Sequence, residues 1–234
     1  MDRKNLDKQI SVIITAAGSG MRMGSLVPKQ FLKLNNKEII YRTVSKFYYL
    51  DYIKEIIIVV AQEEMDRCKS ILKDFKDKLK FAKGGQTREE STYNGLMMVS
   101  DETDIVLTHD GVRPFVTERV IRGAIEELSE ENAIVVCVPA KDTIKNAKDG
   151  YIAYTPNRSE LYNAQTPQVF NRGLLIEGYE KALRERIKVT DDSSLMEVIG
   201  QPVKVYIGEY DNIKITTKID LVIGEILAKM EDES

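Results

Sequence analysis

Histidine and cysteine are scarce in this sequence, and their scarcity limits the kinds of catalytic and metal site it can form. His109 is the single histidine, so a Ser-His-Asp triad or a His-rich zinc site would have just one possible histidine. Cys68 and Cys137 each lie in an apolar pattern, and neither belongs to a CxxC pair. We therefore expect buried, reduced thiols, as in a cytosolic protein, and no disulfide framework.

Long apolar runs and a strong net charge are also lacking. The longest apolar run covers the eight residues 133–140, too few to span a bilayer, and the segment MDRKNLDKQI has no apolar stretch of the signal-peptide kind. We expect a cytoplasmic protein with no membrane partner. The net charge of −3 gives no long-range attraction to nucleic acid, so we expect no such partner either. An anionic ligand would need a local cluster of basic side chains.

Strands and helices alternate along most of the chain. We expect strands at 11–15, 55–61, 79–82, 104–108, 133–138 and 203–207. We expect helices at 39–49, 65–75, 91–99, 117–128, 172–186 and from Thr217 onwards. This alternation predicts an α/β fold with a doubly wound, mostly parallel sheet in one domain over 1–234. Ligands of such sheets bind beyond the carboxyl ends of the strands.

Residues 141–160 interrupt the alternation. Short alternating pieces flank Asp149-Gly150, which is a strong signal for a hairpin turn. We predict a projecting β-arm over 141–160, and we expect it to serve as the dimerisation element of a homodimer.

The first glycine-rich loop, AAGSGMRMG, follows the first predicted strand. Gly18, Gly20 and Gly24 have the spacing G-x-G-x-x-x-G, one place longer than the dinucleotide-binding GxGxxG, which disfavours a dehydrogenase. Such glycines let backbone N–H groups approach a phosphate, although a plain tight turn would use them too. Arg22 and Lys29 add two cations suited to a triphosphate, the alternative being solvated loop charges.

Acidic residues at two places in the sequence, Asp110 and the pair Asp191-Asp192, are considered as metal ligands. Asp110 follows a buried strand and could hold Mg²⁺ together with substrate phosphates, or else cap its turn or pair with Arg113. His109 beside it is interpreted as a packing or hydrogen-bonding residue. Asp191 and Asp192 could suggest a second metal, but we interpret them as a solvated turn.

A series of motifs extends from Val12 to Leu221: AAGSGMRMG with PKQFL, GGQTREES, HDGVRPF, PAKDTIK, PNRSELYNAQTPQVF, TDDSS and NIKITT. In this order they resemble the motifs of the 2-C-methyl-D-erythritol 4-phosphate cytidylyltransferases of the non-mevalonate isoprenoid pathway. The resemblance implies a Rossmann-like nucleotidyltransferase fold and a homodimer. It also implies CTP and methylerythritol phosphate as substrates, pyrophosphate as a product, and Mg²⁺ or another divalent cation as cofactor.

The resemblance also implies roles for individual residues. The implied catalytic cations are Arg22, Lys29 and Lys214. The implied nucleotide pocket consists of Ala16, Ala17, Gly18, Gly85, Ser91, Asp110 and Gly111, with Asp110 near the metal and Gly111 in place of a more usual alanine. The implied acceptor site consists of Thr143, Arg158, Thr166, Thr190 and Lys214. Thr143 and Arg158 lie on the arm and would serve the neighbouring subunit.

Two alternatives remain beside this interpretation. HDGVRPF is also similar to ribitol-5-phosphate cytidylyltransferases, whereas DTIK, PNRSEL and TDDSS favour the methylerythritol acceptor. A nucleotide-binding regulatory domain without turnover would not need Arg22, Lys29, Asp110 and Lys214 together. A phosphate monoester acceptor has its second pKa near 6, so it is largely a dianion at neutral pH and requires no general base. That chemistry suits a chain with one histidine.

Overall fold

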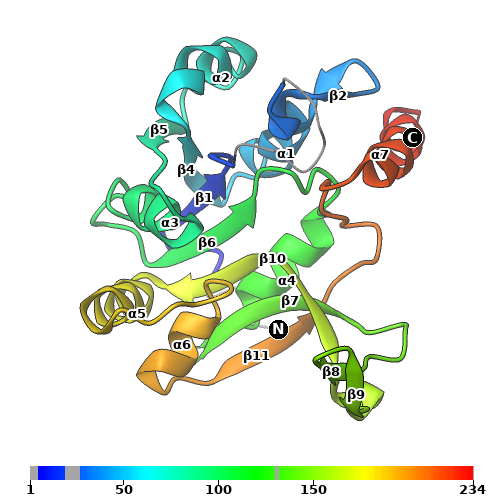
Figure 1. Ribbon diagram of the computed structural model, residues 1–234. Helices are drawn as coiled ribbons and strands as arrows, with labels where there is room; N and C mark the ends of the chain where they lie inside the picture. The colour runs from blue at the N-terminus through cyan, green and yellow to red at the C-terminus, as the bar shows by residue number, and fades with distance from the viewer. Residues whose placement is uncertain (1–4, 19–26, 130–131, 234) are drawn as a thin grey trace.

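The computed structural model describes residues 5–18, 27–129 and 132–233 (Figure 1). Within these residues, seven strands form one sheet in the order β11-β7-β10-β6-β1-β4-β5. The strands are β1 (Ile10–Thr15), β4 (Ile53–Val60), β5 (Leu79–Lys83), β6 (Ile105–Asp110), β7 (Ala133–Pro139), β10 (Tyr162–Asn171) and β11 (Val203–Ile207). Within the seven strands described for this sheet, only β10 runs antiparallel to its neighbours, so the expected mostly parallel sheet is confirmed.

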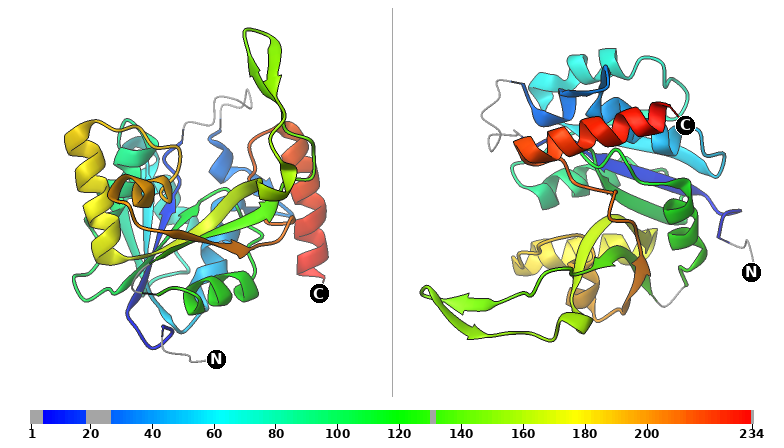
Figure 2. Two further views of the ribbon diagram at one scale, coloured as in Figure 1. Left: turned by 90° about the horizontal axis from the view of Figure 1, so that it is seen from below. Right: turned by 90° about the vertical axis from the view of Figure 1, so that its right-hand side faces the viewer.

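Helices cover both faces of this sheet (Figures 1 and 2). They are α1 (Ile39–Tyr48), α2 (Met65–Ile71), α3 (Arg88–Leu96), α4 (Glu118–Glu126), α5 (Arg172–Glu185), α6 (Ser194–Ile199) and α7 (Lys218–Asp232). Side chains alternate along β1, so Val12 and Ile14 pack with α1, α2 and α4, whereas Ile13 packs with α3, α5 and α6. Burial on both faces is the reason that the strands are continuously apolar.

Threonine side chains determine where three helices begin. Thr117 and Thr217 accept hydrogen bonds from backbone N–H groups three residues on, and Asp220 completes the predicted capping box of α7. Thr87 likewise accepts from the N–H of Glu90 at 3.1 Å. That cap makes α3 begin at Arg88, three residues earlier than the sequence pattern predicts, and places Arg88 in its first turn.

The 141–160 segment contains the expected hairpin. Strands β8 (Asn146–Lys148) and β9 (Tyr151–Tyr154) form a separate two-stranded sheet that projects from the main body (Figure 2). Asp149 and Gly150 have φ of 52° and 84°, the left-handed pair that a tight hairpin of this twist requires. Tyr151 is 82% exposed at the tip, so this chain by itself leaves the arm uncovered.

Some elements differ from the sequence expectation. β10, the helix α6 and the small hairpin of β2 (Lys33–Leu34) and β3 (Lys37–Glu38) were not predicted. In the described residues no helix is both long and apolar enough to cross a membrane. The strand order reverses at β1, whose neighbours are β4 and β6, so a crevice opens beyond the carboxyl ends of β1 and β6.

Candidate active site

A cavity of about 440 Å³ lies at that switch point, beyond the carboxyl ends of β1 and β6. Loops after β1, β5 and β6 line it, together with the segment that precedes α7. The predicted site residues that line it are Ala16, Ala17, Gly18, Lys29, Gly85, Ser91, Asp110 and Lys214. The structure therefore brings the predicted nucleotide pocket and two of the three predicted cations around one space.

Hydrogen bonds to neighbouring segments hold the start of the loop after β1 in place. The backbone N–H of Ala16 donates to the carbonyl of Val59 at 2.7 Å, and the amide of the buried Gln30 donates to the carbonyl of Ala16 at 2.7 Å. Lys29 lies in the short 3-10 helix Lys29–Phe31 beside this loop. Arg22, the third predicted cation, lies outside the described residues. Gln30 was missed, although it directly follows Pro28-Lys29 in the motif.

The loop between β5 and α3 forms the opposite wall. The Ser91 hydroxyl accepts from the backbone N–H of Gly85 at 3.0 Å and donates to the carbonyl of Thr87 at 2.8 Å. A Cβ on Gly84 would lie 2.4 Å from the Cβ of Ala17, so a side chain there would force the two loops apart. Serine and glycine at these positions thus set the width of the pocket.

Asp110 is a buried, ionised carboxylate surrounded by cations. Its oxygens lie 3.0 and 3.1 Å from Lys214 Nζ, and Oδ2 accepts from Arg113 Nε at 3.0 Å. Burial would raise the pKa of this carboxyl, but Lys214, then Arg113 and Arg88, hold the pKa well below its usual range. The pairing of Asp110 with Arg113, considered above as the alternative to a metal-binding role, is present, and Lys214 shares the same carboxylate.

His109 and Thr166 anchor the turn that carries Asp110. The Thr166 hydroxyl accepts from the Asp110 backbone N–H at 3.1 Å and lies 2.9 Å from His109 Nδ1. The hydroxyl proton therefore points to Nδ1, and Nε2 carries the ring proton, which it donates to the Arg113 carbonyl at 3.0 Å. Burial lowers the pKa of His109 to about 4. His109 is a neutral hydrogen-bonding residue, as predicted.

Gly111, the predicted nucleotide-pocket residue that follows Asp110, is buried and is not among the residues that line the cavity in the described part of the chain. A Cβ at this position would lie 2.9 Å from the Thr15 carbonyl oxygen and 3.0 Å from the Cβ of Ala16. The backbone of this turn therefore packs directly on the loop after β1. That close approach leaves little room for a side chain at Gly111 in this chain.

Four predicted acceptor residues do not line this cavity in the described chain. One is the buried Thr166, whose hydroxyl holds the turn of Asp110. Thr190 is exposed on the loop before α6, with its hydroxyl 3.4 Å from that of Ser194. Thr143 is exposed on the arm, and Arg158 lies at the base of the arm, where its guanidinium donates to the Lys141 carbonyl at 3.0 Å. Arg158 lines a separate hollow formed by residues 139–141, residues 157–159 and Tyr162. The predicted role of Thr143 and Arg158 requires a second chain.

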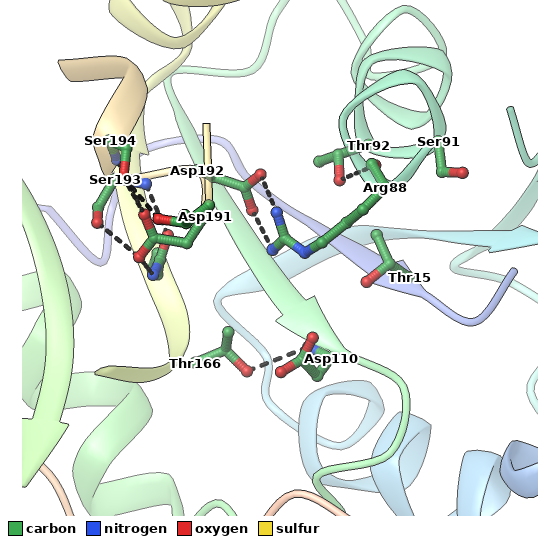
Figure 3. A network of polar contacts seen from close by, with 12 residues as sticks. Thr15, Arg88, Ser91, Thr92, Asp110, Thr166, Asp191, Asp192, Ser193 and Ser194 are labelled. Atoms are coloured by element: carbon green, nitrogen blue, oxygen red, sulfur yellow. Dashed lines mark hydrogen bonds and ion pairs between the residues drawn. The ribbon is translucent and has the colours of Figure 1, made fainter. Parts of the chain in front are cut away.

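The interpretation of Asp191 and Asp192 as a solvated turn is wrong. Asp192 is fully buried and accepts hydrogen bonds from both terminal nitrogens of Arg88 at 2.9 and 3.0 Å (Figure 3). It also accepts a hydrogen bond from the hydroxyl of Tyr179 at 2.7 Å. Asp191 accepts from Gln168 at 2.7 Å. Arg88, which lines the cavity, was missed because nothing near it in the sequence indicates a buried partner 104 residues away.

Asp110 is also the one candidate ligand for a divalent cation among the described lining residues. No group of three His, Cys, Asp or Glu side chains capable of holding a metal occurs in 5–18, 27–129 and 132–233. An all-protein cage is therefore not formed by these residues. A single carboxylate in a cavity that Lys29, Arg88 and Lys214 also line fits Mg²⁺, which is held by one or two carboxylates together with substrate phosphates.

Comparison with known proteins adds independent information. Residues 10–230 match the family model described as 2-C-methyl-D-erythritol 4-phosphate cytidylyltransferase. A protein of that name from Clostridioides difficile strain 630 is 48% identical over 223 residues, which is 94% of each chain. One from Alkaliphilus metalliredigens is 43% identical, over 96% of this chain and 95% of its own. The crystal structure of 4-diphosphocytidyl-2C-methyl-D-erythritol synthase from Anaerococcus prevotii superposes with a TM-score of 0.85 at 39% identity, covering 95% of this chain and 99% of that one.

Proposed function

Because the chain belongs to the 2-C-methyl-D-erythritol 4-phosphate cytidylyltransferase family, we propose that it transfers the cytidylyl group of CTP to 2-C-methyl-D-erythritol 4-phosphate. The products are 4-diphosphocytidyl-2-C-methyl-D-erythritol and pyrophosphate. The observation that carries the proposal is the cavity at the sheet's switch point, with backbone-rich loops on two sides and Lys29, Asp110 and Lys214 in its lining.

The loops after β1 and β5 are the proposed binding surface for the cytidine. Ala16, Gly85 and Ser91 line the narrow space between two loops that touch at Gly84 and Ala17, and their hydrogen bonds within the protein hold the loop backbones in fixed directions. Backbone groups held in fixed directions select a base by its hydrogen-bonding edge, and the narrow space disfavours a purine. CTP should therefore be used in strong preference to ATP.

The proposed chemistry is an in-line attack of the acceptor phosphate on the α-phosphorus of CTP. The acceptor is already a dianion near neutral pH, so no side chain has to remove a proton. His109 supports this view, because both ring nitrogens are engaged and its pKa is lowered to about 4. What opposes reaction is the approach of two anions, and Arg22, Lys29 and Lys214 are proposed to neutralise the charge that develops.

Asp110 is the residue proposed to hold Mg²⁺ or another divalent cation. Its carboxylate is ionised and faces the cavity, with Lys214 on Oδ1 and both Lys214 and Arg113 on Oδ2. When bound, the cation supplies positive charge to the triphosphate and to the leaving pyrophosphate. Lys214 is proposed to turn from Asp110 to the acceptor phosphate when the substrates are present.

We also propose that the enzyme is a cytoplasmic homodimer that completes each site with the partner's arm. The exposed arm carries Thr143 and Arg158, which line no part of the cavity of their own chain as described. An arm whose Tyr151 is 82% exposed is a surface that a second chain would cover. Both Cys68 and Cys137 are buried free thiols, which suits a reducing compartment.

The test is an assay of pyrophosphate release by the purified protein with CTP, Mg²⁺ and a single acceptor. 2-C-methyl-D-erythritol 4-phosphate should support turnover, and ribitol 5-phosphate should not. Omitting Mg²⁺ with a chelator should abolish the reaction. Turnover with ATP comparable to that with CTP, or turnover with ribitol 5-phosphate but not with 2-C-methyl-D-erythritol 4-phosphate, would refute the proposed function.

A further inference from the structure

One ion pair joins the nucleotide wall of the cavity to the loop that carries the predicted acceptor residue Thr190. Arg88 lies in the first turn of α3, and Asp192 lies in the loop that precedes α6. Both terminal guanidinium nitrogens donate to the two carboxylate oxygens, at 2.9 and 3.0 Å (Figure 3). This two-point contact fixes orientation as well as distance, because the planar guanidinium and carboxylate must be coplanar to make it.

On the side of the nucleotide, Arg88 belongs to the turn that shapes the pocket. Ser91 is one helical turn further on and holds the Gly85 N–H, and the Thr92 hydroxyl donates to the carbonyl of Arg88 at 3.1 Å. A displacement of this turn would therefore move Gly85 and Ser91 together. Arg88 itself lines the cavity, with 32% of its side chain exposed.

On the opposite side, Asp192 fixes the loop that carries the predicted acceptor residue Thr190. The loop has two anchors: Asp191 accepts from Gln168 of β10 at 2.7 Å, and Asp192 is paired with Arg88 and with the Tyr179 hydroxyl of α5. Gln168 ties the loop to the central sheet. The pair with Arg88 ties the same loop to the nucleotide wall.

Charge and burial make this pair an obligatory contact. Asp192 is fully buried, and a buried carboxylate is tolerated only when it is paired and hydrogen-bonded. Burial would lower the pKa of Arg88, but Asp192 raises that pKa above its ordinary value. Since Asp192 neutralises Arg88 and occupies both terminal nitrogens, Arg88 is placed to hold the two loops and not to act as one more phosphate-binding cation.

We propose that the Arg88–Asp192 pair is a positioning brace, which couples the binding of the nucleotide to the binding of the acceptor phosphate. The inference rests on the proposed function, since it assumes that both substrates occupy this site. Ordering the nucleotide loop by CTP orders the loop of Thr190 through the brace, and the reverse holds equally because coupling between two sites is reciprocal.

The experiment measures the Kd of 2-C-methyl-D-erythritol 4-phosphate by calorimetry, with and without a CTP analogue that has a methylene bridge between the α and β phosphorus atoms. In the wild type the analogue should tighten acceptor binding on the order of fivefold or more, the lower end of typical coupling. In Arg88→Lys and in Asp192→Asn this ratio should fall close to one. Their kcat/KM should fall by about 10- to 100-fold, as expected for small misplacements of reacting groups.

Two further variants keep the test decisive. Arg88→Gln combined with Asp192→Asn removes both charges together, so it avoids a lone buried charge should a single variant fail to fold. Arg42→Lys is the matched control, because Arg42 is a buried arginine paired with Asp232 of α7, outside the cavity. It should lower the melting temperature and leave the coupling ratio at the wild-type value.

The outcomes separate this inference from the proposed function. A wild type that releases no pyrophosphate from CTP and the acceptor would overturn the proposed function, and the brace with it. An active wild type without coupling, or brace variants that keep the wild-type ratio, would overturn the brace alone. If Arg42→Lys also lost the coupling, the loss in the brace variants would be explained by general destabilisation of the fold, and the brace would be refuted.

Discussion

Replacing Lys214 by methionine separates its proposed catalytic role from its visible structural one. Lys214 Nζ lies 3.0 Å from Asp110 Oδ2, but the lysine side chain is 39% exposed, so solvent screens the pair. Exposed ion pairs contribute roughly 0.2–1 kcal/mol to stability, and Arg113 still pairs with Asp110 in the variant. We therefore expect Lys214→Met to lower the free energy of unfolding by less than about 1 kcal/mol.

The effect on the reaction should be much larger. Loss of one donor that neutralises charge in the transition state costs roughly 3–4 kcal/mol, or about 10²- to 10³-fold in kcat. Both quantities are measured on the same preparation, by urea unfolding and by pyrophosphate release.

Lys204→Met is the matched control for this prediction. Lys204 pairs with Glu127 at 2.7 Å, with 55% of its side chain exposed, and it does not line the cavity as described. The control should show the same small change in stability and wild-type kcat. A Lys214→Met variant that retains more than half of the wild-type kcat would remove Lys214 from the proposed mechanism. A loss of several kcal/mol in stability would instead show that Arg113 does not suffice as a partner for Asp110.

Three other perturbations follow from the site. Lys29→Ala and Arg22→Ala should each lower kcat by about 10²- to 10³-fold, as measured by pyrophosphate release, with little change in melting temperature; near-normal kcat in either variant would exclude that residue. Burial lowers the pKa of His109 from 6.5 to about 4, so between these pH values the unfolded chain binds more protons than the folded chain. The contribution of neutral His109 to the free energy of unfolding is therefore fully present above about pH 6.5, and the free energy of unfolding should decrease by up to roughly 3 kcal/mol as the pH falls to 4. Urea unfolding of His109→Gln across this range should show a shallower slope, and an unchanged slope would contradict the assignment. If the arm of one subunit completes the site of the other in a two-fold dimer, mixing inactive Arg158→Ala with inactive Arg22→Ala should restore activity to about a quarter of all sites. Confirmed subunit exchange without recovered activity would refute the sharing of sites between subunits.

Local sequence signals were sufficient for most of the sheet and for the arm. Ile10–Thr15, Ile53–Val60 and Ala133–Pro139 are apolar because each is covered on both faces, and that pattern is visible without knowing the partners. The hairpin at Asp149 was predictable because the turn needs residues that tolerate positive φ. In both cases the determining interaction lies within a few residues of the signal.

Strand β10 shows where local reasoning fails. Tyr162–Asn171 contains Pro167, and a proline within a run argues against a central strand. The pairing of β10 with β7 is irregular between Ala164 and Gln168, and the chain accommodates the proline there while it still fills the space between β6 and β7. Only the packing of the two flanking strands requires a strand at this position.

The candidate active site likewise has features that local sequence predicts and features that depend on contacts between distant residues. The order of residues along the chain is enough to place glycine-rich and charged loops after β1, β5 and β6, and the parallel sheet then gathers these loops at one edge. In contrast, the burial of Asp192 against Arg88, 104 residues away, and the link from Thr166 to His109, 57 residues away, arise only when the chain is folded. The physical reason is that a side chain's conformation and turn preferences depend on its neighbours in sequence, whereas its burial and its hydrogen-bond partner depend on which distant segments the folded chain brings beside it.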